Sequence, residues 1–586
     1  MQGSCAAMRI SRVETMTDSK IAMPWLEHYP EGVPAEIDLS NLGTIPDLFE
    51  QSVADYSAAL AIESFGVTMT YGQLGAEVRR IAISLQKMGL KKGDRAAIML
   101  PNVMAYPPLI YGILMAGGVV VNVNPLYTAR EVTLQLNDSG ARVIFVLENF
   151  AHTVSDSLDK LEKLETAVVI APGDLLGWKG KLVNFVSRWV KRAVPPFRLP
   201  ASMRYWHFVH LGSTEKFRPP GITADDIAFL QYTGGTTGIS KGATLLHRNV
   251  VANVMQAEAW LKPFVKGAGP KVMYTALPLY HIFALTACCL FVTKIGAMQL
   301  LIANPRDIPG FVKQLQKRPP NMLALVNTLF NVLSHAPGIE QVDFSDLQLA
   351  VAGGMSTQAA VAKRWHELTG KPIVEAYGLS ETSPMVTSNR PDIAEFTGTI
   401  GYPVSSTVVT IRSPEGDILP AGEAGEVCVH GPQVMAGYWN RPDETAKVMT
   451  ADGSFRSGDV GVLQEDGQIK LIDRIKDMIV VSGLKVFPNE VEDVLASHPA
   501  VLEAAVIGLP DPHSGEAVTA YVVLREGATA SAEEIRTFAR DRLSGYKVPR
   551  SVNMRDELPK TNVGKILRRE LRDQVAYAGG RGSPSP

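Results

Sequence analysis

Short apolar runs alternate with longer amphipathic stretches along most of the chain. The predicted strands are short, rich in aliphatic and β-branched residues and nearly free of charge: residues 142–147, 167–170, 272–277, 299–302, 349–352 and 372–377. Stretches such as 71–88 and 309–317 lie between or before them, and their apolar residues recur with a helical period, which predicts helices. Strands that alternate with helices favour an α/β fold whose sheets are largely parallel and buried.

The pattern changes beyond about residue 400. Short strands with Gly, Asp and Pro turns over residues 408–412, 425–430 and 460–471 predict a small β-rich subdomain. From Lys476 a strand–helix–strand pattern resumes and carries its own apolar periodicity. This block predicts a separate, small and mobile α+β C-terminal domain that follows a large N-terminal domain.

These changes of pattern predict the limits of the domains. The predicted parts are a disordered extension over residues 1–23, a large domain over 24–473, a small domain over 474–573 and a disordered tail over 574–586. The N-terminus has no apolar run of signal-peptide length. Two uncharged runs, 103–121 and 272–293, contain Pro or Gly breakers, so each predicts a buried strand joined to a buried helix more than a membrane span.

Composition narrows the class of protein further. A chain of 586 residues is too long for one compact core, and 46% hydrophobic and 20% charged residues exclude wholesale disorder. The net charge of -2 lacks the electrostatic footprint of a general nucleic-acid binder, so we expect no nucleic-acid partner. Four cysteines are too few for a disulfide scaffold, and none forms a zinc-like Cys/His cluster. A reducing, cytoplasmic compartment fits this cysteine usage.

Residues 232–242, which read YTGGTTGISKG, predict a phosphate-binding loop. Glycines let the backbone approach a polyphosphate, threonine hydroxyls add donors, and the Lys241 ammonium neutralises charge. A strand-like approach before the loop and a helical pattern after it disfavour the alternative of a flexible linker. The string lacks the Gly-Lys-Ser/Thr ending of a Walker loop, so a P-loop NTPase fits poorly.

The loop resembles the phosphate-loop signature of the adenylate-forming superfamily, which includes acyl-CoA synthetases. The other signatures of that superfamily follow in the expected order: PLYHIFAL (278–285), AVAGGMS (350–356), EAYGLSET (375–382), FRSGD (455–459), IDRIKDMIVVSGLKVFPNEVE (472–492) and LPKTNVGKILRREL (558–571). The resemblance extends over residues 24–573. It is closest to bacterial long-chain fatty-acid–CoA ligases, which share strings such as NVNPLYTARE and NPRDIPG.

The resemblance implies a two-step reaction. ATP would activate a long-chain or medium-chain fatty acid to acyl-AMP, and CoA as co-substrate would then form the thioester, with Mg²⁺ as the metal and AMP and pyrophosphate as products. One alternative is a fatty acyl-AMP ligase that loads a carrier protein, although the insertion typical of that group is not obvious here. The other alternative is a non-catalytic lipid-binding protein, which the intact set of charged motif residues disfavours.

The resemblance also assigns residues to the nucleotide and the metal. The expected ATP-binding residues are Tyr232, Thr233, Gly234, Gly235, Thr236, Thr237, Gly238, Lys241, Gly353, Gly354, Tyr377, Gly378, Ser380, Asp459 and Arg474. Asp459 would accept from the ribose hydroxyls, and Tyr377 offers a flat face for adenine. Glu381 is a suitable Mg²⁺ ligand, because Mg²⁺ prefers carboxylate, phosphate and water oxygens, and Thr233 is expected nearby. The expected catalytic residues are Lys241, Glu381, Thr382 and Lys565.

The remaining expectations concern the small domain and the path of the substrates. Lys565 would bridge carboxylate and α-phosphate during adenylation and withdraw when the small domain rotates about the hinge residue Lys476. Gly483 and Lys485 would then face the site and admit the CoA thiol. His281 would gate acyl or thiol access, or it is a satisfied core histidine.

A basic amphipathic segment lies outside these motifs. Residues 175–214 contain seven Lys or Arg and no Asp or Glu, and aromatic and aliphatic residues from Trp178 to Ala193 fall at helical spacing. A basic face beside an aromatic face is typical of helices that lie in a membrane interface. The segment has two interpretations: it contacts anionic lipid at the inner face of the cell membrane, or it packs on the protein's own domain. A homodimer is a further alternative.

Overall fold

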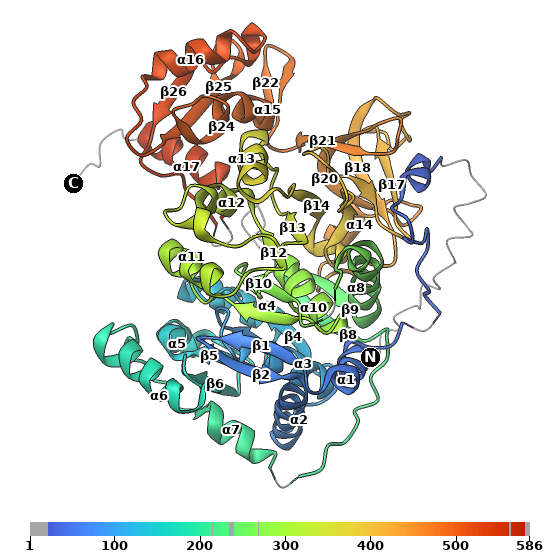
Figure 1. Ribbon diagram of the computed structural model, residues 1–586, viewed down its shortest axis with the longest axis vertical. Coiled ribbons are helices and arrows are strands. Elements are labelled where there is room, and N and C mark those ends of the chain that lie inside the picture. Colours follow the sequence, from blue (N-terminus) through green and yellow to red (C-terminus); the bar gives the residue numbers. More distant parts are fainter. Residues whose placement is uncertain are drawn as a thin grey trace.

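The structure is a computed structural model, and it describes residues 22–40, 42–213, 215–233, 240–267, 269–561 and 564–579. The outer parts of both predicted disordered ends lie outside these ranges. A large domain carries a smaller C-terminal domain at one end (Figure 1).

Helix α17 (Arg568–Gly579) continues past Asp573, where the sequence predicted the tail to begin. Leu571 of this helix is buried and Val575 packs against the same core, which explains why the helix extends.

Two large sheets form the main body of the described chain. The first has nine strands in the order β16 (Tyr402–Pro403), β15 (Met385–Ser388), β14 (Val374–Gly378), β13 (Leu349–Ala352), β12 (Met322–Leu325), β10 (Val272–Thr275), β11 (Met298–Leu301), β1 (Leu60–Ser64) and β2 (Val67–Thr70). The second has eight in the order β19 (Gly437–Tyr438), β9 (Lys241–Leu246), β8 (Ile227–Thr233), β4 (Val119–Asn122), β3 (Arg95–Met99), β5 (Val143–Leu147), β6 (Thr166–Ile170) and β7 (Ser202–Arg204).

The central strands of both sheets are parallel, as the sequence predicted. Strands β14, β13, β12, β10, β11 and β1 pair in parallel, and so do β7, β6, β5, β3, β4 and β8. Each of the six strands predicted before residue 400 overlaps one of these strands. The mixed α/β fold class is therefore confirmed.

Helices cover both faces of each sheet. Those before the small domain are α1 (Ile45–Tyr56), α2 (Tyr71–Lys87), α3 (Tyr106–Met115), α4 (Ala129–Ser139), α5 (Ala151–Ser155), α6 (Gly177–Phe185), α7 (Tyr205–Leu211), α8 (His247–Leu261), α9 (Ile282–Ala284), α10 (Phe291–Lys294), α11 (Ile308–Lys317), α12 (Asn327–Ser334), α13 (Ala359–Thr369) and α14 (Pro442–Val448). The largest core joins α1, α2, α3 and α8 to strands of both sheets. Separate cores lie under α11 to α13 and under α4 and α5.

Local sequence explains where several of these helices begin. Thr70 caps α2 in a capping box with Gln73, and Thr128 caps α4 in the same way with Glu131.

The uncharged run 103–121 contains helix α3 followed by strand β4, and 272–293 contains β10 followed by α9, a π-helical turn and α10. Within the described residues, no helix is both long and apolar enough to cross a bilayer.

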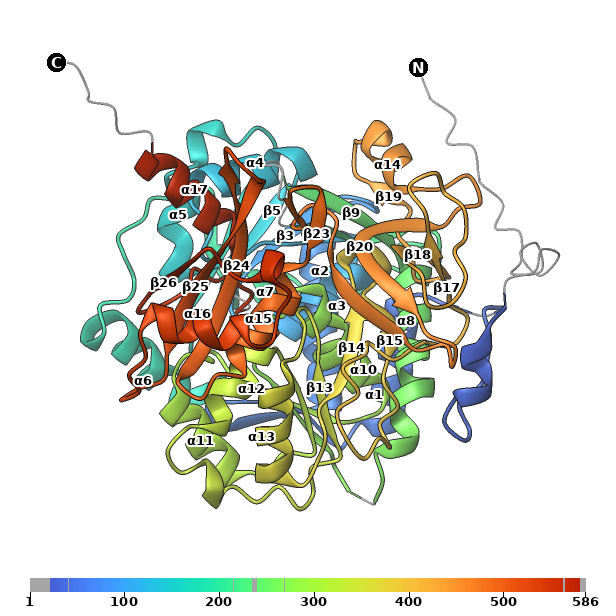
Figure 2. The same cartoon turned by 90° about the horizontal axis from the view of Figure 1, so that it is seen from above.

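The β-rich unit and the small domain follow in sequence. The β-rich sheet has the order β17 (Val408–Arg412), β18 (Ala424–His430), β20 (Phe455–Leu463) and β21 (Ile469–Arg474), all antiparallel. The small domain contains β22 (Ile479–Val481), β23 (Leu484–Val486), α15 (Pro488–Ala496), β24 (Val501–Asp511), β25 (Gly515–Leu524), α16 (Ala532–Arg540), β26 (Ser551–Met554) and α17. Figure 2 shows this domain lying over the large domain.

Candidate functional site

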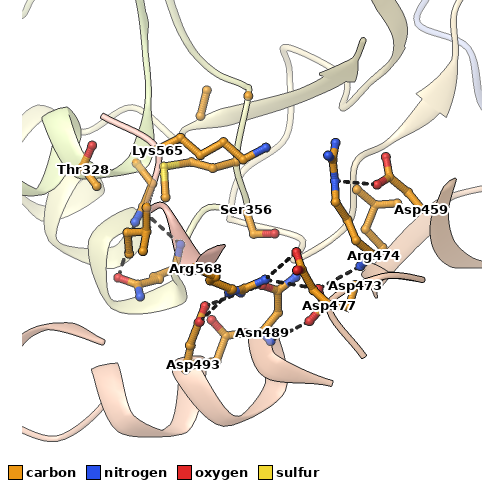
Figure 3. A pocket seen from close by; sticks show the side chains of 18 of the residues that line it. Thr328, Ser356, Asp459, Asp473, Arg474, Asp477, Asn489, Asp493, Lys565 and Arg568 are labelled. Atoms are coloured by element: carbon orange, nitrogen blue, oxygen red, sulfur yellow. Dashed lines mark hydrogen bonds and ion pairs between the residues drawn. The ribbon is translucent and has the colours of Figure 1, made fainter. Parts of the chain in front are cut away.

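Two adjacent cavities lie where the small domain meets the large domain. The first, which we call the polar cavity, has a volume of about 560 Å³ and is lined mainly by charged and polar residues. The second, which we call the apolar cavity, has a volume of about 680 Å³, and many aliphatic and aromatic residues line it beside charged ones. Both are lined by Tyr377, Arg474, Lys476 and Lys565, which therefore stand at their junction. Figure 3 shows Lys565 and Arg568 of the small domain facing Asp459 and Arg474 across the polar cavity.

The carboxyl ends of parallel strands supply one wall of the site. Gly353 and Gly354 follow β13, and Tyr377 and Gly378 end β14, so both pairs reach the cavities at the edge where open α/β sheets bind ligands. Gly378 is required sterically, because a Cβ atom there would lie 1.9 Å from the carbonyl oxygen of Pro384. Tyr232 also lines the apolar cavity, and its hydroxyl donates to Asp138 over 2.6 Å.

Asp459 and Arg474 are neighbours on adjacent strands. They are register partners on β20 and β21, and Arg474 Nε lies 2.9 Å from Asp459 Oδ1. The other carboxylate oxygen accepts from the Tyr377 hydroxyl over 2.7 Å. Asp459 is only 4% exposed, yet it lines the polar cavity, so its remaining lone pairs are available to hydroxyl donors there.

Glu381 provides a buried carboxylate at the apolar cavity. Its side chain accepts from the Tyr438 hydroxyl over 2.7 Å, and burial raises its pKa above the ordinary value. A bound cation would offset this cost of burying the charge. Thr233 lines the same cavity. The described residues contain no cluster of three or more His, Cys, Asp or Glu suited to a metal, so Mg²⁺ here would need phosphate oxygens and water besides Glu381, a set that this ion commonly uses.

The described part of the phosphate loop holds Lys241. Its ammonium forms an ion pair with Glu444 of α14 and lies 5.2 Å from the centre of the Tyr438 ring. The partner carboxylate has its pKa lowered to about 2, first by the hydrogen bond from Lys241 and then by that from Lys447. Five predicted loop residues lie outside the described residues: Gly234, Gly235, Thr236, Thr237 and Gly238.

Thr382 and Ser380 differ in their position relative to the cavity. Ser380 lines it, but Thr382 is fully buried, and its hydroxyl donates to the Pro384 carbonyl over 2.5 Å while accepting from Leu379 N–H. In this arrangement Thr382 holds the loop that carries Glu381. A contact between Thr382 and a phosphate stays a prediction, and it would require these hydrogen bonds to change.

Lys565 enters the junction of the cavities from the small domain. The loop before it contacts the large domain, because Thr328 Oγ1 donates to the Gly564 carbonyl over 3.2 Å. Gly564 has φ of +82°, and a Cβ atom on it would lie 2.6 Å from that hydroxyl oxygen, so only glycine fits this approach. Burial, followed by the neighbouring charge of Arg474, lowers the pKa of Lys565 to about 8.

His281 lines the apolar cavity at the start of α9. Its Nδ1 accepts from Phe283 N–H over 3.4 Å, and burial, followed by the charge of Lys565, lowers its pKa to about 4. The ring is therefore neutral at physiological pH. Solvent still reaches part of the side chain, so His281 lies at the wall of the cavity and not within the sealed core.

The structure does not bring every predicted residue to the cavities. Gly483 and Lys485 are exposed in the β22–β23 hairpin, and neither lines the polar or the apolar cavity. Lys476 does line both cavities, just after the end of β21, and burial lowers its pKa. The predicted approach of the hairpin to the site would therefore need a different arrangement of the two domains.

Two family models match the chain. A family model described as AMP-binding enzyme matches residues 49–439, and one described as AMP-binding enzyme C-terminal domain matches residues 490–565. The chain belongs to the AMP-binding enzyme family. The long-chain-fatty-acid–CoA ligase of Yersinia pestis is 48% identical over 95% of this chain and 98% of its own. The ligase of the same name from Bacillus subtilis (strain 168) is 37% identical over 94% of this chain and 98% of its own.

Solved structures resemble this AMP-binding enzyme over most of its length. ATP-bound MatB from Rhodopseudomonas palustris has a TM-score of 0.78 and 28% identity, with 90% of this chain and 98% of that chain covered. A benzoate CoA ligase from Burkholderia xenovorans LB400 has a TM-score of 0.77 and 26% identity, with 90% of this chain and 99% of that chain covered. The large and small domains of the fold thus have known counterparts.

The sequence analysis missed several side chains of this AMP-binding enzyme that organise the site. Tyr438 and Glu444 hold Glu381 and Lys241, although 57 and 203 residues separate the members of each pair. The string RPDETAK (441–447) was the available signal, because Pro followed by acidic residues marks a helix start. That signal predicts helix α14 but not the lysine that its carboxylate contacts.

A second missed group surrounds Arg568. Its guanidinium binds Glu492 over 2.6 and 2.9 Å. It also binds Asp473 over 3.3 Å and contacts Asn489 (Figure 3). Asp473 belongs to β21, whereas Glu492 and Asn489 belong to α15 of the small domain. This cluster, which we call the Arg568 latch, ties the last strand of the β-rich sheet to the small domain.

The wall of the apolar cavity is built from segments that lie far apart in the sequence. Phe283, Ala287, Ala324 and Val351 line it. Helix α8 also contributes Ala257 and Leu261, a contribution that the sequence did not indicate. This helix packs between distant segments of the chain, so its periodicity predicts a buried face without indicating which cavity that face borders.

Proposed function

We propose that the protein is an AMP-forming acid–thiol ligase that converts a long-chain fatty acid to its CoA thioester. In the first step a carboxylate oxygen of the acid bonds to the α-phosphorus of ATP, and the bond to pyrophosphate breaks. In the second step the CoA sulfur bonds to the acyl carbon, and AMP leaves with the carboxyl oxygen. Its substrates are thus the fatty acid, ATP and CoA, and Mg²⁺ accompanies ATP.

The observation that carries this proposal is the mixed lining of the apolar cavity beside Lys565. Lys241 and Glu381 offer charges to a nucleotide and its metal, whereas Phe283 and Val351 offer an apolar wall to a fatty-acid chain, so a charged nucleotide and a water-insoluble chain can meet there at one carboxylate. Each buried methylene contributes about 0.8 kcal/mol, so an apolar cavity selects acids with long chains. The names of the curated relatives support the same substrates and product.

Adenylation brings two anions together, so cations must offset their repulsion. We propose that Lys565 bridges the fatty-acid carboxylate and the α-phosphate, and that Lys241 leaves Glu444 to bind the outer phosphates. Glu381 would hold Mg²⁺, which supplies charge neutralisation when bound. Asp459 would accept from the ribose hydroxyls, with Arg474 keeping its carboxylate oriented.

We further propose that residues 24–473 act as the large domain and residues 474–573 as the small domain, which rotates about Lys476 after pyrophosphate leaves. The rotation would withdraw Lys565 and bring Gly483 and Lys485 to the cavities. His281, which is neutral and lies beside the apolar cavity, would then admit the acyl carbonyl or the thiol. A few residues that absorb a large backbone change are sufficient for such domain motion.

A panel of saturated acids of increasing chain length tests this proposal. Pyrophosphate release without CoA reports adenylation, and CoA-dependent AMP release reports the second step. We expect both with acids of twelve to eighteen carbons, as a rough range, and little with acetate, because burial of the chain supplies the binding energy. Pyrophosphate release without any CoA-dependent AMP formation would instead indicate loading of another acceptor and contradict the ligase.

We also propose that the enzyme is cytoplasmic and works at the inner face of the cell membrane as a peripheral protein. Its substrate partitions into lipid, and the basic segment over residues 175–214 contains no acidic residue. A homodimer that buries the same exposed side chains is the rival arrangement. Sedimentation of the protein without lipid separates the two, because only the homodimer changes the mass of the particle.

A further inference from the structure

One helix at the edge of the large domain exposes a set of large apolar side chains. Helix α6 continues into a π-helical turn, Val186–Val190, and we call residues 177–190 the edge helix. Figures 1 and 2 both show α6 at the periphery of the molecule. The exposed fractions are 76% for Trp178, 60% for Leu182, 56% for Phe185, 72% for Trp189 and 64% for Val190. No other helix in the described ranges exposes more than one large apolar side chain to this degree.

The spacing of these residues places them on one strip. Trp178, Leu182, Phe185 and Trp189 are separated by four, three and four positions, which aligns side chains along one face of a helix. Single exposed apolar residues are common on soluble proteins, whereas a contiguous apolar patch marks a surface that contacts something else. We therefore expect the strip to contact a partner with apolar character.

The inner face of the edge helix, not the apolar strip, attaches it to the domain, and Val183 on this face packs against the main core. Arg188 binds the buried carboxylate of Glu148 through Nε and Nη2, over 2.9 and 2.6 Å. Asn184 accepts from Gly173 N–H over 2.7 Å, and a Cβ atom on Gly180 would lie 2.0 Å from the Gly173 carbonyl oxygen. The helix is thus held closely by its inner face, so the strip points away from the protein.

The surroundings of the strip are positively charged. Lys181, Lys191 and Arg192 are exposed, and no acidic residue occurs between positions 175 and 214. The neighbouring β1–β2 turn adds to the same edge: Lys179 Nζ donates to the Gly66 carbonyl over 3.2 Å, and Phe65 is 53% exposed. This combination of apolar strip and flanking cations complements an anionic, partly apolar surface.

We propose that the edge helix binds the surface of an anionic phospholipid bilayer. The aromatic and aliphatic side chains enter the boundary between headgroups and acyl chains, and the flanking cations contact headgroup phosphates. Pairing of two edge helices in a homodimer is disfavoured, because a twofold axis would bring the same positive charges together. The proposal deepens the proposed function, on which it rests for a fatty-acid substrate that is dissolved in the membrane.

Two variants of the full-length protein test the surface, each with a matched control. Lys181→Glu/Lys191→Glu/Arg192→Glu reverses exposed charges without touching Arg188, and Lys363→Glu is its control on a distant helix whose lysine side chain is 79% exposed. Trp178→Ser/Trp189→Ser removes the aromatic strip. Its control is Trp206→Ser on α7, where the tryptophan is 63% exposed. Flotation with vesicles of phosphatidylglycerol and phosphatidylcholine, and with phosphatidylcholine alone, measures binding.

We expect the parent and both controls to float with the anionic vesicles at low salt. The charge variant should bind about 100-fold more weakly, and the strip variant should lose binding at low and at high salt. Trp178 and Trp189 fluorescence in the parent should shift to the blue on binding. Unchanged flotation of both variants would overturn the proposal, and so would a parent that ignores vesicles and sediments as a dimer that these substitutions dissociate.

Turnover of a water-soluble medium-chain acid without vesicles separates this proposal from the proposed function. If the two variants retain the parental rate but use vesicle-held long-chain acid poorly, both proposals stand. A parent that floats but releases no pyrophosphate with any acid would refute the ligase and leave the lipid surface intact. A strip variant that unfolds would refute the outward orientation of the helix, and circular dichroism detects this outcome.

Discussion

Two residues that line the cavities have pKa values shifted from their ordinary values. Burial and the charge of Arg474 lower the pKa of Lys565 to about 8, and burial raises that of Glu381. A lysine that becomes harder to charge and a carboxylate that becomes harder to ionise both gain from ligands of opposite charge. An anionic substrate beside Lys565 and a cation beside Glu381 would relieve these two costs together.

The proposed role of Lys565 makes a prediction that separates the two half-reactions. Lys565→Ala should slow acyl-AMP formation by about 100- to 1,000-fold, because a cation between two anions is lost. Thioester formation from supplied acyl-AMP and CoA should stay within about twofold of the parent. Quenched single-turnover assays measure each step, and equal loss in both would contradict the assignment.

The pH dependence of adenylation provides a second readout of the same residue. In the free enzyme Lys565 loses its proton as the pH rises through about 8, so kcat/KM for adenylation should fall above that value. Lys565→Arg should move the falling limb to higher pH, whatever its absolute rate. A limb that stays at the parental position in this variant would assign the titration to another group.

Glu381→Gln tests the proposed metal ligand with little change of size. The amide oxygen still accepts from Tyr438, so the loop should keep its shape while the negative charge is lost. Adenylation should weaken by about 10- to 100-fold and require more Mg²⁺. Titration of the rate with Mg²⁺ at saturating ATP measures the change, and an unaltered curve would leave Glu381 a structural role only.

At the scale of elements, the sequence predicted the buried parallel strands well and the surface poorly. Strands such as β5 and β13 are buried on both faces, so their composition alone identifies them. The order of strands within the two sheets could not be read, because it depends on contacts between distant segments. The edge helix was identified as amphipathic, but its inner contacts depend on Glu148, 40 residues from Arg188, and on two glycines that carry no periodic signal.

The inner attachment of the edge helix makes a stability prediction. Glu148 is fully buried and is shared by Arg188 and Arg204. Arg188→Gln should lower the free energy of unfolding by about 2 kcal/mol, because it leaves a buried carboxylate with one cation fewer. The control Lys191→Gln changes an exposed side chain and should have little effect. Equal denaturation midpoints for the two variants would show that Arg204 alone suffices.

At the scale of the whole molecule, the Arg568 latch connects the small domain to the last strand of the β-rich sheet. It is formed across 95 residues, between α17 and β21, so no local pattern predicted it. The motifs did predict that the two domains share one site, because the family resemblance assigns their residues to a single reaction. They did not indicate which side chains hold the domains in the arrangement seen here, because those contacts join residues that lie far apart in the sequence.

Removal of the latch should affect one half-reaction more than the other. Arg568→Met leaves Glu492 and Asp473 without their shared cation, so the arrangement with Lys565 in the site loses support. Adenylation should fall by about tenfold while thioester formation from acyl-AMP changes less. Arg569→Met, on the same helix with a side chain 52% exposed, is the matched control. A uniform loss in both steps with normal folding would contradict a conformational role.

Asp473 makes contacts in both domains. Its backbone pairs with Val460 in the β-rich sheet, while its side chain is held by Arg568 and by the backbone N–H of Asn489. Under the proposed rotation this carboxylate must release one set of partners. If ATP binds better to one arrangement of the domains and CoA to the other, each would lower the affinity of the protein for the other by the same factor. This antagonism would not require the two substrates to compete for the same atoms. An excess of either substrate would then slow the step that the other requires.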